Sequence, residues 1–143
     1  MDRRADTPNT RDDRIQNMIA HVPYLRRYAL ALTGDLDLGD GFVTRVLDDV
    51  MKAPDVIRLE NPRLALYAAL NELADAMGLR PAPSPHPVEA ALAALPEDAR
   101  RLYLLISLED LALPDAAAVL GMAAEEAVER LNHDFGMQTR LVT

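Results

Sequence analysis

Apolar residues recur at intervals of three and four along most of this 143-residue chain, a pattern that predicts a series of amphipathic helices. In the first half, the spacing predicts helices over residues 11–32, 38–51 and 61–77. Pro23 should kink the first helix or mark a new first turn, and Gly34 should end it. In the third helix we expect these residues to be buried: Leu64, Tyr67, Leu70, Leu73 and Met77.

A proline-rich segment divides the chain into two parts. Four of the eight residues in 80–87 are prolines, which exclude a helix interior and favour an extended spacer. Beyond this segment, the apolar spacing predicts four further helices, over residues 88–94, 97–109, 114–120 and 123–135. We therefore expect an all-α fold of two helical subdomains, residues 11–78 and 88–137, joined by a linker at 79–87 and preceded by a disordered N-terminus at 1–10.

Residues 114–131 carry the pattern of a helix-turn-helix. A short helix containing Ala117 is followed by a turn at Gly121 and by a second helix with Ala127 and Leu131 facing inward. Two helices that cross near a right angle need small side chains where they touch, and the turn needs a residue that tolerates positive φ. An ordinary helical hairpin with an alanine-rich contact is the alternative.

The second helix of this motif is acidic where a DNA-reading helix would be basic. It begins with Glu125 and Glu126, continues to Glu129, and has Arg130 as its only early cation. Residues 110–137 hold six acidic residues and one arginine, in a chain of net charge -8. Carboxylates facing a phosphate backbone are repelled and release no counterions, so we predict that this helix does not read DNA. Complementing the helix dipole would explain only the first two acids.

The composition narrows the remaining chemistry. The absence of cysteine excludes disulfides, thiolate metal sites and a cysteine nucleophile. The three histidines lie on different predicted elements without metal-ligand spacing: His21, His86 and His133. Adjacent carboxylates such as Asp48 and Asp49 point about 100° apart on a helix and form no acid–base pair. We expect no catalytic residue, metal or cofactor, and, without a signal peptide or membrane span, a cytoplasmic protein.

Three motifs give the chain a more specific resemblance. Residues 21–35 read HVPYLRRYALALTGD, residues 39–47 read GDGFVTRVL, and residues 91–100 read ALAALPEDAR. In this order they resemble group-15 extracytoplasmic-function sigma factors of the EcfG type, and still more the sigma-like half of PhyR-type response regulators. The likeness covers nearly all of residues 15–135, with a sigma region 2-like part first and a sigma region 4-like part second.

This resemblance implies a partner switch in the general stress response of alphaproteobacteria. A PhyR-type regulator joins a sigma-like domain to a C-terminal receiver, and phosphorylation of the receiver releases the sigma-like domain. The released domain captures a helical anti-sigma factor, NepR, by imitating the sigma factor, which then joins RNA polymerase. The chain is therefore predicted to be an anti-anti-sigma factor. Residues 138–143 resemble the start of a linker to a receiver, so we expect a fragment cut there, with a stand-alone paralogue as the alternative.

The third predicted helix departs from that of a working sigma factor, which melts and reads promoter DNA. No Lys or Arg follows Arg63 in it, and Tyr67 is its only aromatic residue. Stacking on unpaired bases needs aromatic side chains in positive surroundings. The departure favours a decoy. A genuine DNA-binding sigma factor is the alternative, and a ligand-binding or structural helical domain is a third hypothesis.

The NepR-like partner is expected to lay an amphipathic helix into apolar grooves. The candidate contacts lie on the second helix and in the region 4-like part: Val43, Val46, Leu47, Leu102 and Leu105. Stripes at helical spacing are more often core, so we expect only one or two of these at an interface. Tyr24, Arg26 and Arg27 are further candidates, which either pair with the acidic second half, meet carboxylates on the partner, or form a solvated basic face.

Overall fold

The computed structural model describes residues 16, 18–52, 61–79 and 85–134, and every regular element in these ranges is helical. The elements are, in chain order, α3 (Val22–Thr33), α4 (Leu36–Lys52), α5 (Pro62–Ala76), α6 (Pro87–Ala93), α7 (Glu97–Tyr103), the π-helical turn η2 (Leu104–Leu108), α8 (Leu113–Val119) and α9 (Ala124–Asp134). The all-α prediction is confirmed. The predicted N-terminal disorder at 1–10, most of the proline-rich linker and residues 138–143 lie outside the described residues.

Local sequence explains where the first helices begin and end. Pro23 lies in the first turn of α3, so it marks a new first turn, one of the two outcomes that the sequence predicted. Gly34 closes α3 in the left-handed conformation, at φ 75°, and donates its N–H to the carbonyl oxygen of Leu30 at 2.7 Å. Asn61 caps α5 by accepting two backbone N–H groups of the first turn.

Three sequence predictions are wrong in detail. The single helix expected over residues 97–109 is α7 followed by the π-helical turn η2, which ends at Leu108, and Asp110 then takes a positive φ of 60°. Helix α6 begins at Pro87, inside the predicted linker, because proline suits the first helical position. Met77 is 62% exposed instead of buried, because it lies at the C-terminal cap of α5.

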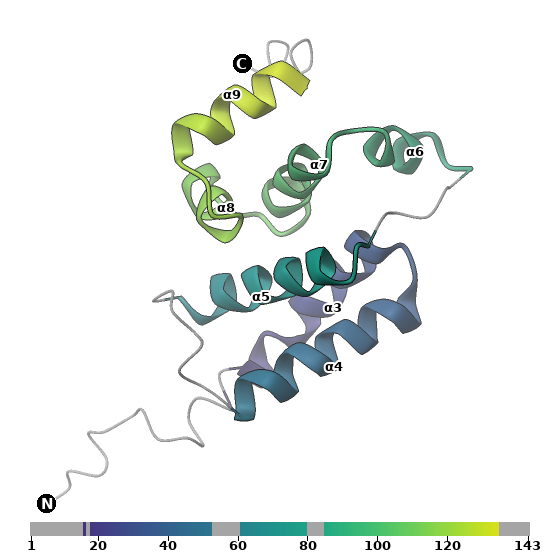
Figure 1. The fold of residues 1–143 in the computed structure, drawn as a ribbon, viewed down its shortest axis with the longest axis vertical. Helices are drawn as coiled ribbons and strands as arrows, with labels where there is room; N and C mark the ends of the chain where they lie inside the picture. The colour runs from purple at the N-terminus through teal and green to yellow at the C-terminus, as the bar shows by residue number, and fades with distance from the viewer. Residues whose placement is uncertain (1–15, 17, 53–60, 80–84, 135–143) are drawn as a thin grey trace, which may run out of the picture.

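The helices pack as two groups on either side of a continuous core. We call α3–α5 the first helical group and α6–α9 the second. Figure 1 shows α5 between the α3–α4 pair and helices α7–α9, and contacts join α5 to α8 and α3 to η2. The buried apolar residues of both groups form one cluster. None of the helices in the described ranges is both long and apolar enough to span a membrane.

Candidate functional site

The apolar candidates for partner binding lie mainly in the core. Val43 and Val46 of α4 are each 3% exposed, and Leu102 and Leu105 are fully buried. Leu47 is half-buried and packs against the same cluster. In this arrangement of the helices, four of the five side chains offer no surface to a partner. These four side chains stabilise the fold, and Leu47 stays the one of the five that is still a candidate contact.

The two adjacent arginines of α3 have different partners. Arg26 donates two hydrogen bonds to Asp40 of α4, at 2.9 and 3.1 Å, within the first helical group. Arg27 donates two to Glu109, at 2.8 and 3.0 Å, across the junction with the second group. Both pairs are bidentate, which fixes the geometry of the guanidinium and the carboxylate. Of the two arginines, Arg27 is the one that joins the halves of the molecule.

Glu109 is the centre of a polar cluster at that junction. Its side chain is fully buried. Besides Arg27, it accepts a 2.5 Å hydrogen bond from the hydroxyl of Tyr67, and Arg63 lies 3.5 Å from its carboxylate and donates to its backbone carbonyl at 3.0 Å. The guanidinium of Arg63 stacks over the ring of Tyr24, 4.4 Å from the centroid. We call these five residues the Glu109 cluster.

Burial and hydrogen bonding shift the pKa values of two members of this cluster, Tyr67 and Arg27. Removal from solvent, and the hydrogen bond to Glu109, raise the pKa of Tyr67 above its usual range, so that its hydroxyl remains a donor. The hydrogen bond to the same carboxylate raises the pKa of Arg27. Desolvation and the charge of Arg63 lower the pKa of the neighbouring His21, whose Nδ1 is buried without a hydrogen-bond partner in the described part of the chain.

A second polar contact joins the two groups at the other end of α7. Arg100 is 3% exposed and donates to the carbonyl oxygens of Ala31 and Leu32, at 3.1 and 3.0 Å, in the last turn of α3. A cation is favourable there, because the carbonyls at a helix C-terminus lack partners and carry partial negative charge. Arg101 contacts Asp75 of α5 at 2.9 Å. Both arginines also pair with Glu97.

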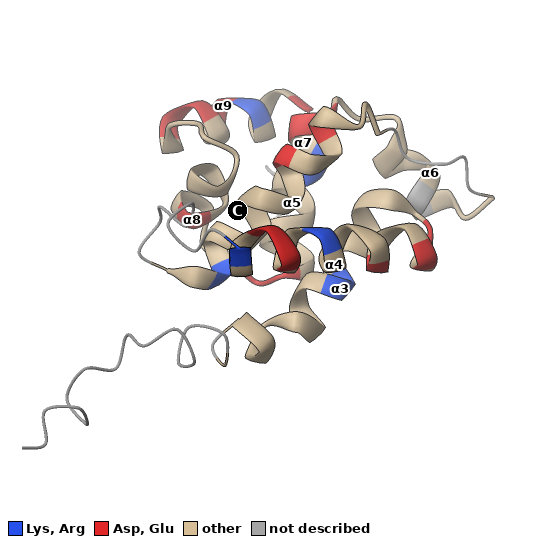
Figure 2. Cartoon of the chain, turned by 60° about the horizontal axis from the view of Figure 1, so that its bottom comes forward, with Lys and Arg blue, Asp and Glu red and all other residues tan. Residues whose placement is uncertain are grey.

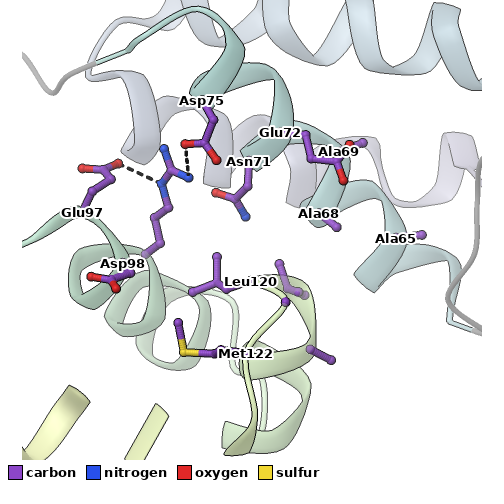
Figure 3. Close-up of a pocket in the computed structure, with 14 residues that line it drawn as sticks. Ala65, Ala68, Ala69, Asn71, Glu72, Asp75, Glu97, Asp98, Leu120 and Met122 are labelled. Atoms are coloured by element: carbon purple, nitrogen blue, oxygen red, sulfur yellow. Dashed lines mark hydrogen bonds and ion pairs between the residues drawn. The ribbon is translucent and has the colours of Figure 1, made fainter. Parts of the chain in front are cut away.

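A groove of about 860 Å³ lies between α5 of the first group and α7, α8 and the α8–α9 turn of the second. Small and apolar residues line much of it: Ala65, Ala68, Ala69, Ala118, Val119, Leu120 and Met122. The rest of the lining is polar or charged, apart from Gly121: Asn71, Glu72, Asp75, Glu97, Asp98 and Arg101. Figure 3 shows the carboxylates of Asp75 and Glu97 beside the groove, both held by the same arginine, Arg101. The groove has an apolar floor, and its rim carries four acids against one arginine, which suits an amphipathic helix with cationic flanks.

Helices α8 and α9 form the predicted helix-turn-helix. Gly121 takes a φ of 73° in the turn, and Ala117 and Ala127 are buried where the two helices pack. On the outer face of α9 the side chains of three glutamates are exposed: Glu125, Glu126 and Glu129. Figure 2 shows this acidic stretch followed by the single blue segment of Arg130, which pairs with Asp98 of α7 at 3.3 Å. The one cation predicted on this helix is therefore engaged within the chain.

The aromatic residue of α5 is also unavailable to DNA. Tyr67 is fully buried, and its ring meets Tyr28 edge-on, with the centroids 5.3 Å apart. The Tyr28 hydroxyl donates to Asn71 at 2.9 Å, which ties the ring pair to α5. A side chain that is buried in this way cannot stack on an unpaired base.

Within the described ranges, no group of three or more His, Asp or Glu residues could hold a metal ion.

The chain is similar in sequence and fold to known regulators. Residues 18–71 match the family described as the sigma2 domain of PhyR. The phyllosphere-induced regulator PhyR of Methylorubrum extorquens is 29% identical over 110 residues, which cover 73% of this chain and 41% of that protein. The PhyRSL–NepR complex from Sphingomonas sp. Fr1 has a TM-score of 0.69 at 29% identity, over 85% of this chain and 83% of that chain.

A second solved complex agrees with these three matches. The anti-anti-sigma factor PhyR from Bartonella quintana, solved with the anti-sigma factor NepR, has a TM-score of 0.67 at 28% identity, over 82% of this chain and 46% of that chain. In both fold and sequence the chain resembles the sigma-like helical domains of these proteins, and the predicted resemblance to PhyR-type regulators is confirmed. The chain spans less than half the length of the PhyR proteins from M. extorquens and B. quintana.

Sequence reasoning missed four residues that join the two groups, namely Glu109, Arg63, Arg100 and Arg101. A signal for Glu109 was present, because Leu102, Leu105 and Glu109 follow one another at spacings of three and four and share one helix face. An acid on an apolar stripe indicates a buried carboxylate with a cationic partner. The spacing does not identify that partner, since Arg27 lies 82 residues away in sequence.

Proposed function

We propose that this chain is an anti-anti-sigma factor: a sigma-like domain that imitates an extracytoplasmic-function sigma factor and sequesters its NepR-like anti-sigma factor. The sigma factor freed in this way would direct transcription of the general stress response. The observation that carries the proposal is the acidic outer face of α9 on an intact helix-turn-helix. It is supported by the likeness to PhyR, which is described in its complexes as binding NepR.

Electrostatics separates a decoy from a DNA-binding sigma factor. Non-specific affinity for DNA comes mainly from cations that displace counterions from phosphates. The outer face of α9 presents Glu125, Glu126 and Glu129, and Arg130 is paired with Asp98. A duplex approaching this helix therefore meets charge of its own sign. The charged surface of this helix-turn-helix is therefore better suited to imitating a sigma factor in a protein complex than to reading DNA bases.

The groove between α5 and α7–α8 is the surface that we assign to the partner. Its alanine floor, at Ala65, Ala68 and Ala69, allows a helix to approach closely. Glu72 and Asp98 lie in its lining; because Asp98 already pairs with Arg130, Glu72 is the carboxylate that we assign to a cation flanking the apolar stripe of the incoming helix. The previously predicted contacts Val43, Val46, Leu102 and Leu105 would support this surface from within the core.

The proposal also includes the domain boundaries, the regulatory domain and the cellular location. We place the two functional parts at residues 11–78 and 88–137, with the linker at 79–87, and expect a receiver domain to regulate the pair in a full-length regulator. The switch would operate in the cytoplasm, where transcription takes place, and it requires no reaction chemistry of this chain. The PhyR proteins described above, to which this chain is similar, are either named as a regulator or solved in complex with an anti-sigma factor.

Isothermal titration with a purified NepR-like protein tests the proposal. We expect saturable binding to the wild-type chain and a loss of about tenfold or more for Ala68→Arg, which places a bulky cation in the groove floor. Ala76→Arg is the matched control, because Ala76 lies exposed on the same helix and outside the groove lining. Circular dichroism checks that both variants fold. Absence of binding to the wild-type chain would sink the proposal.

Run-off transcription separates the decoy from the alternative, a genuine sigma factor. With core RNA polymerase and a stress promoter, we expect no transcript from this chain alone. Adding the chain to a mixture of sigma factor and NepR-like protein should restore the transcript. A promoter-dependent transcript without any other sigma factor would establish the alternative instead.

A further inference from the structure

The burial of the Glu109 carboxylate requires a physical explanation. Glu109 is fully enclosed, and removing a charge from water is costly unless partners replace the lost hydration. Its side-chain partners are Arg27 of α3 and Arg63 and Tyr67 of α5. All three belong to the first helical group, whereas Glu109 follows η2 in the second. The carboxylate is therefore satisfied only when the two groups are in this relative position.

The geometry of these contacts fixes orientation as well as distance. The pairing of Arg27 with Glu109 is bidentate, at 2.8 and 3.0 Å, and so restricts rotation about the contact. A buried ion pair adds little net stability compared with apolar packing, but it penalises arrangements in which its partners do not meet. The cluster thus selects one arrangement among those that would bury a similar apolar area.

A second contact acts at a distance from the first. Arg100 bonds the last turn of α3 through Ala31 and Leu32, nine residues before Glu109. On α3 the two contact points, Arg27 and the Ala31–Leu32 carbonyls, are four to five residues apart, or roughly 6–8 Å at the rise of an α-helix. Two separated contacts between the same pair of elements prevent both sliding and pivoting. Arg27 and the last turn of α3 thereby hold the α7–η2 segment at two separate points.

The groove depends on this arrangement, since its two walls come from different groups. Ala65, Ala68 and Ala69 belong to α5, whereas Leu120 and Met122 belong to the second group. Glu109 is not among the lining residues. The width of the groove is set by how the groups meet, and a binding surface that is already in its bound geometry loses less entropy on association.

We propose that Glu109 is a positioning residue: with Arg27, it fixes the relative orientation of the two helical groups and so preforms the groove that captures the partner. This inference rests on the proposed function for the identity of the partner, but its structural part stands independently. The residue acts through the arrangement of the groups and not by touching the partner.

Spin-label distances test the structural part. The chain has no cysteine, so a Cys pair replacing the exposed Asp37 of α4 and Glu126 of α9 reports the separation of the groups without background labelling. We expect one narrow distance distribution for the otherwise unaltered chain, and a broadened or shifted one for Glu109→Gln and Arg27→Gln. Arg26→Gln is the matched control, because Arg26 makes the same bidentate contact within one group, to Asp40.

Affinity for a NepR-like protein tests the functional part. If the variants hold the competent arrangement for roughly a tenth of the time, Glu109→Gln and Arg27→Gln bind about tenfold more weakly, and the double variant is no worse than either single one. Arg26→Gln binds like the wild type. Should Glu109→Gln fail to fold, Arg27→Lys provides the same comparison, because it keeps the charge and loses the bidentate geometry.

The outcomes are distinguishable. Unchanged distances together with unchanged affinity in Glu109→Gln would overturn the inference, as would an equal effect of Arg26→Gln. A wild-type chain that binds no NepR-like protein contradicts the proposed function, yet the distance measurements still decide whether Glu109 positions the groups. Weakened affinity with an unchanged distance distribution also overturns the inference, because the residue would then act by another route.

Discussion

Glu97 shows how a single side chain serves two buried cations. It accepts hydrogen bonds from Arg100 at 2.7 and 3.2 Å and from Arg101 at 2.9 Å. Partial burial of its carboxylate opposes ionisation, but the hydrogen bonds and charges of the two arginines outweigh that effect and lower the pKa of Glu97. The arginines in turn bond α3 and α5, so the ionisation of Glu97 is linked to the contact between the helical groups.

Replacement of Glu97 by Gln should therefore have a pH-dependent cost. A carboxylate with a lowered pKa in the folded state adds stability above its unfolded value of 4.5, and this is lost as the pH falls through the folded value. At neutral pH we expect E97Q to lower the free energy of unfolding by about 1 kcal/mol, a modest figure because the side chain is 35% exposed. Denaturant titrations of both proteins from neutral to acidic pH should show the difference shrinking. A difference that stays constant would contradict the assignment.

At the scale of elements, α3 and α4 pack closely at a glycine. A Cβ built on Gly39 would lie 3.1 Å from the backbone carbonyl of Ala29 and from the backbone nitrogen of Leu30. Backbone atoms cannot move aside as a flexible side chain can. Gly41 lies two residues further along α4. A Cβ built on Gly41 would have no neighbouring atom within 4 Å. The two glycines of one helix therefore differ in function: the first permits packing and the second only adds backbone freedom.

These glycines predict opposite effects of the same substitution. Gly39→Ala should destabilise the fold by about 1–3 kcal/mol, because α3 and α4 must move apart. Gly41→Ala should stabilise it by about 0.5–1 kcal/mol, because alanine loses less backbone entropy in a helix than glycine. Midpoints of chemical unfolding compare the two variants directly. An unchanged or raised midpoint for Gly39→Ala would show that the helices do not approach as described.

For the whole molecule, the distribution of charge matters more than the net value of -8. The basic residues of the first group are paired with acids: Arg26 with Asp40, and Arg27 with Glu109. The exposed acids of α9 lie on the face that a DNA-reading helix would offer to a groove. The molecule combines a nucleic-acid-binding scaffold with a surface that repels nucleic acid.

Reversing the charge on the outer face of α9 should give the helix-turn-helix an affinity for duplex DNA. We expect the wild-type chain not to retard a duplex oligonucleotide at about 50 mM salt, and a variant with Lys at positions 125, 126 and 129 to retard it in a salt-sensitive way. The control carries Lys at positions 37, 48 and 49 of α4, which gives the same net charge elsewhere. Equal retardation by both variants would mean that net charge, and not the α9 surface, determines DNA binding.

Local patterns in the sequence were sufficient for the helices and for the helix-turn-helix. Periodicity, the proline at Pro23 and the glycines at Gly34 and Gly121 determine helices and turns through contacts within a few residues, which a linear reading can follow. The motifs at residues 21–35 and 39–47 indicated the PhyR-type resemblance, and residues 18–71 match its sigma2 family. The sequence also predicted the acidic surface of α9, because its acids lie within a few residues of one another.

Only the tertiary structure decided which apolar stripes are core and which polar residues meet. Val43, Val46, Leu102 and Leu105 lie on stripes that the sequence alone could place in the core or, less often, at an interface, and the packing of the helices buried them. The contact between Arg27 and Glu109 spans 82 residues, and many pairings of charge are compatible with one sequence. Helical periodicity arises from neighbours along the chain, whereas the junction and its groove arise from neighbours in space, which no local pattern specifies.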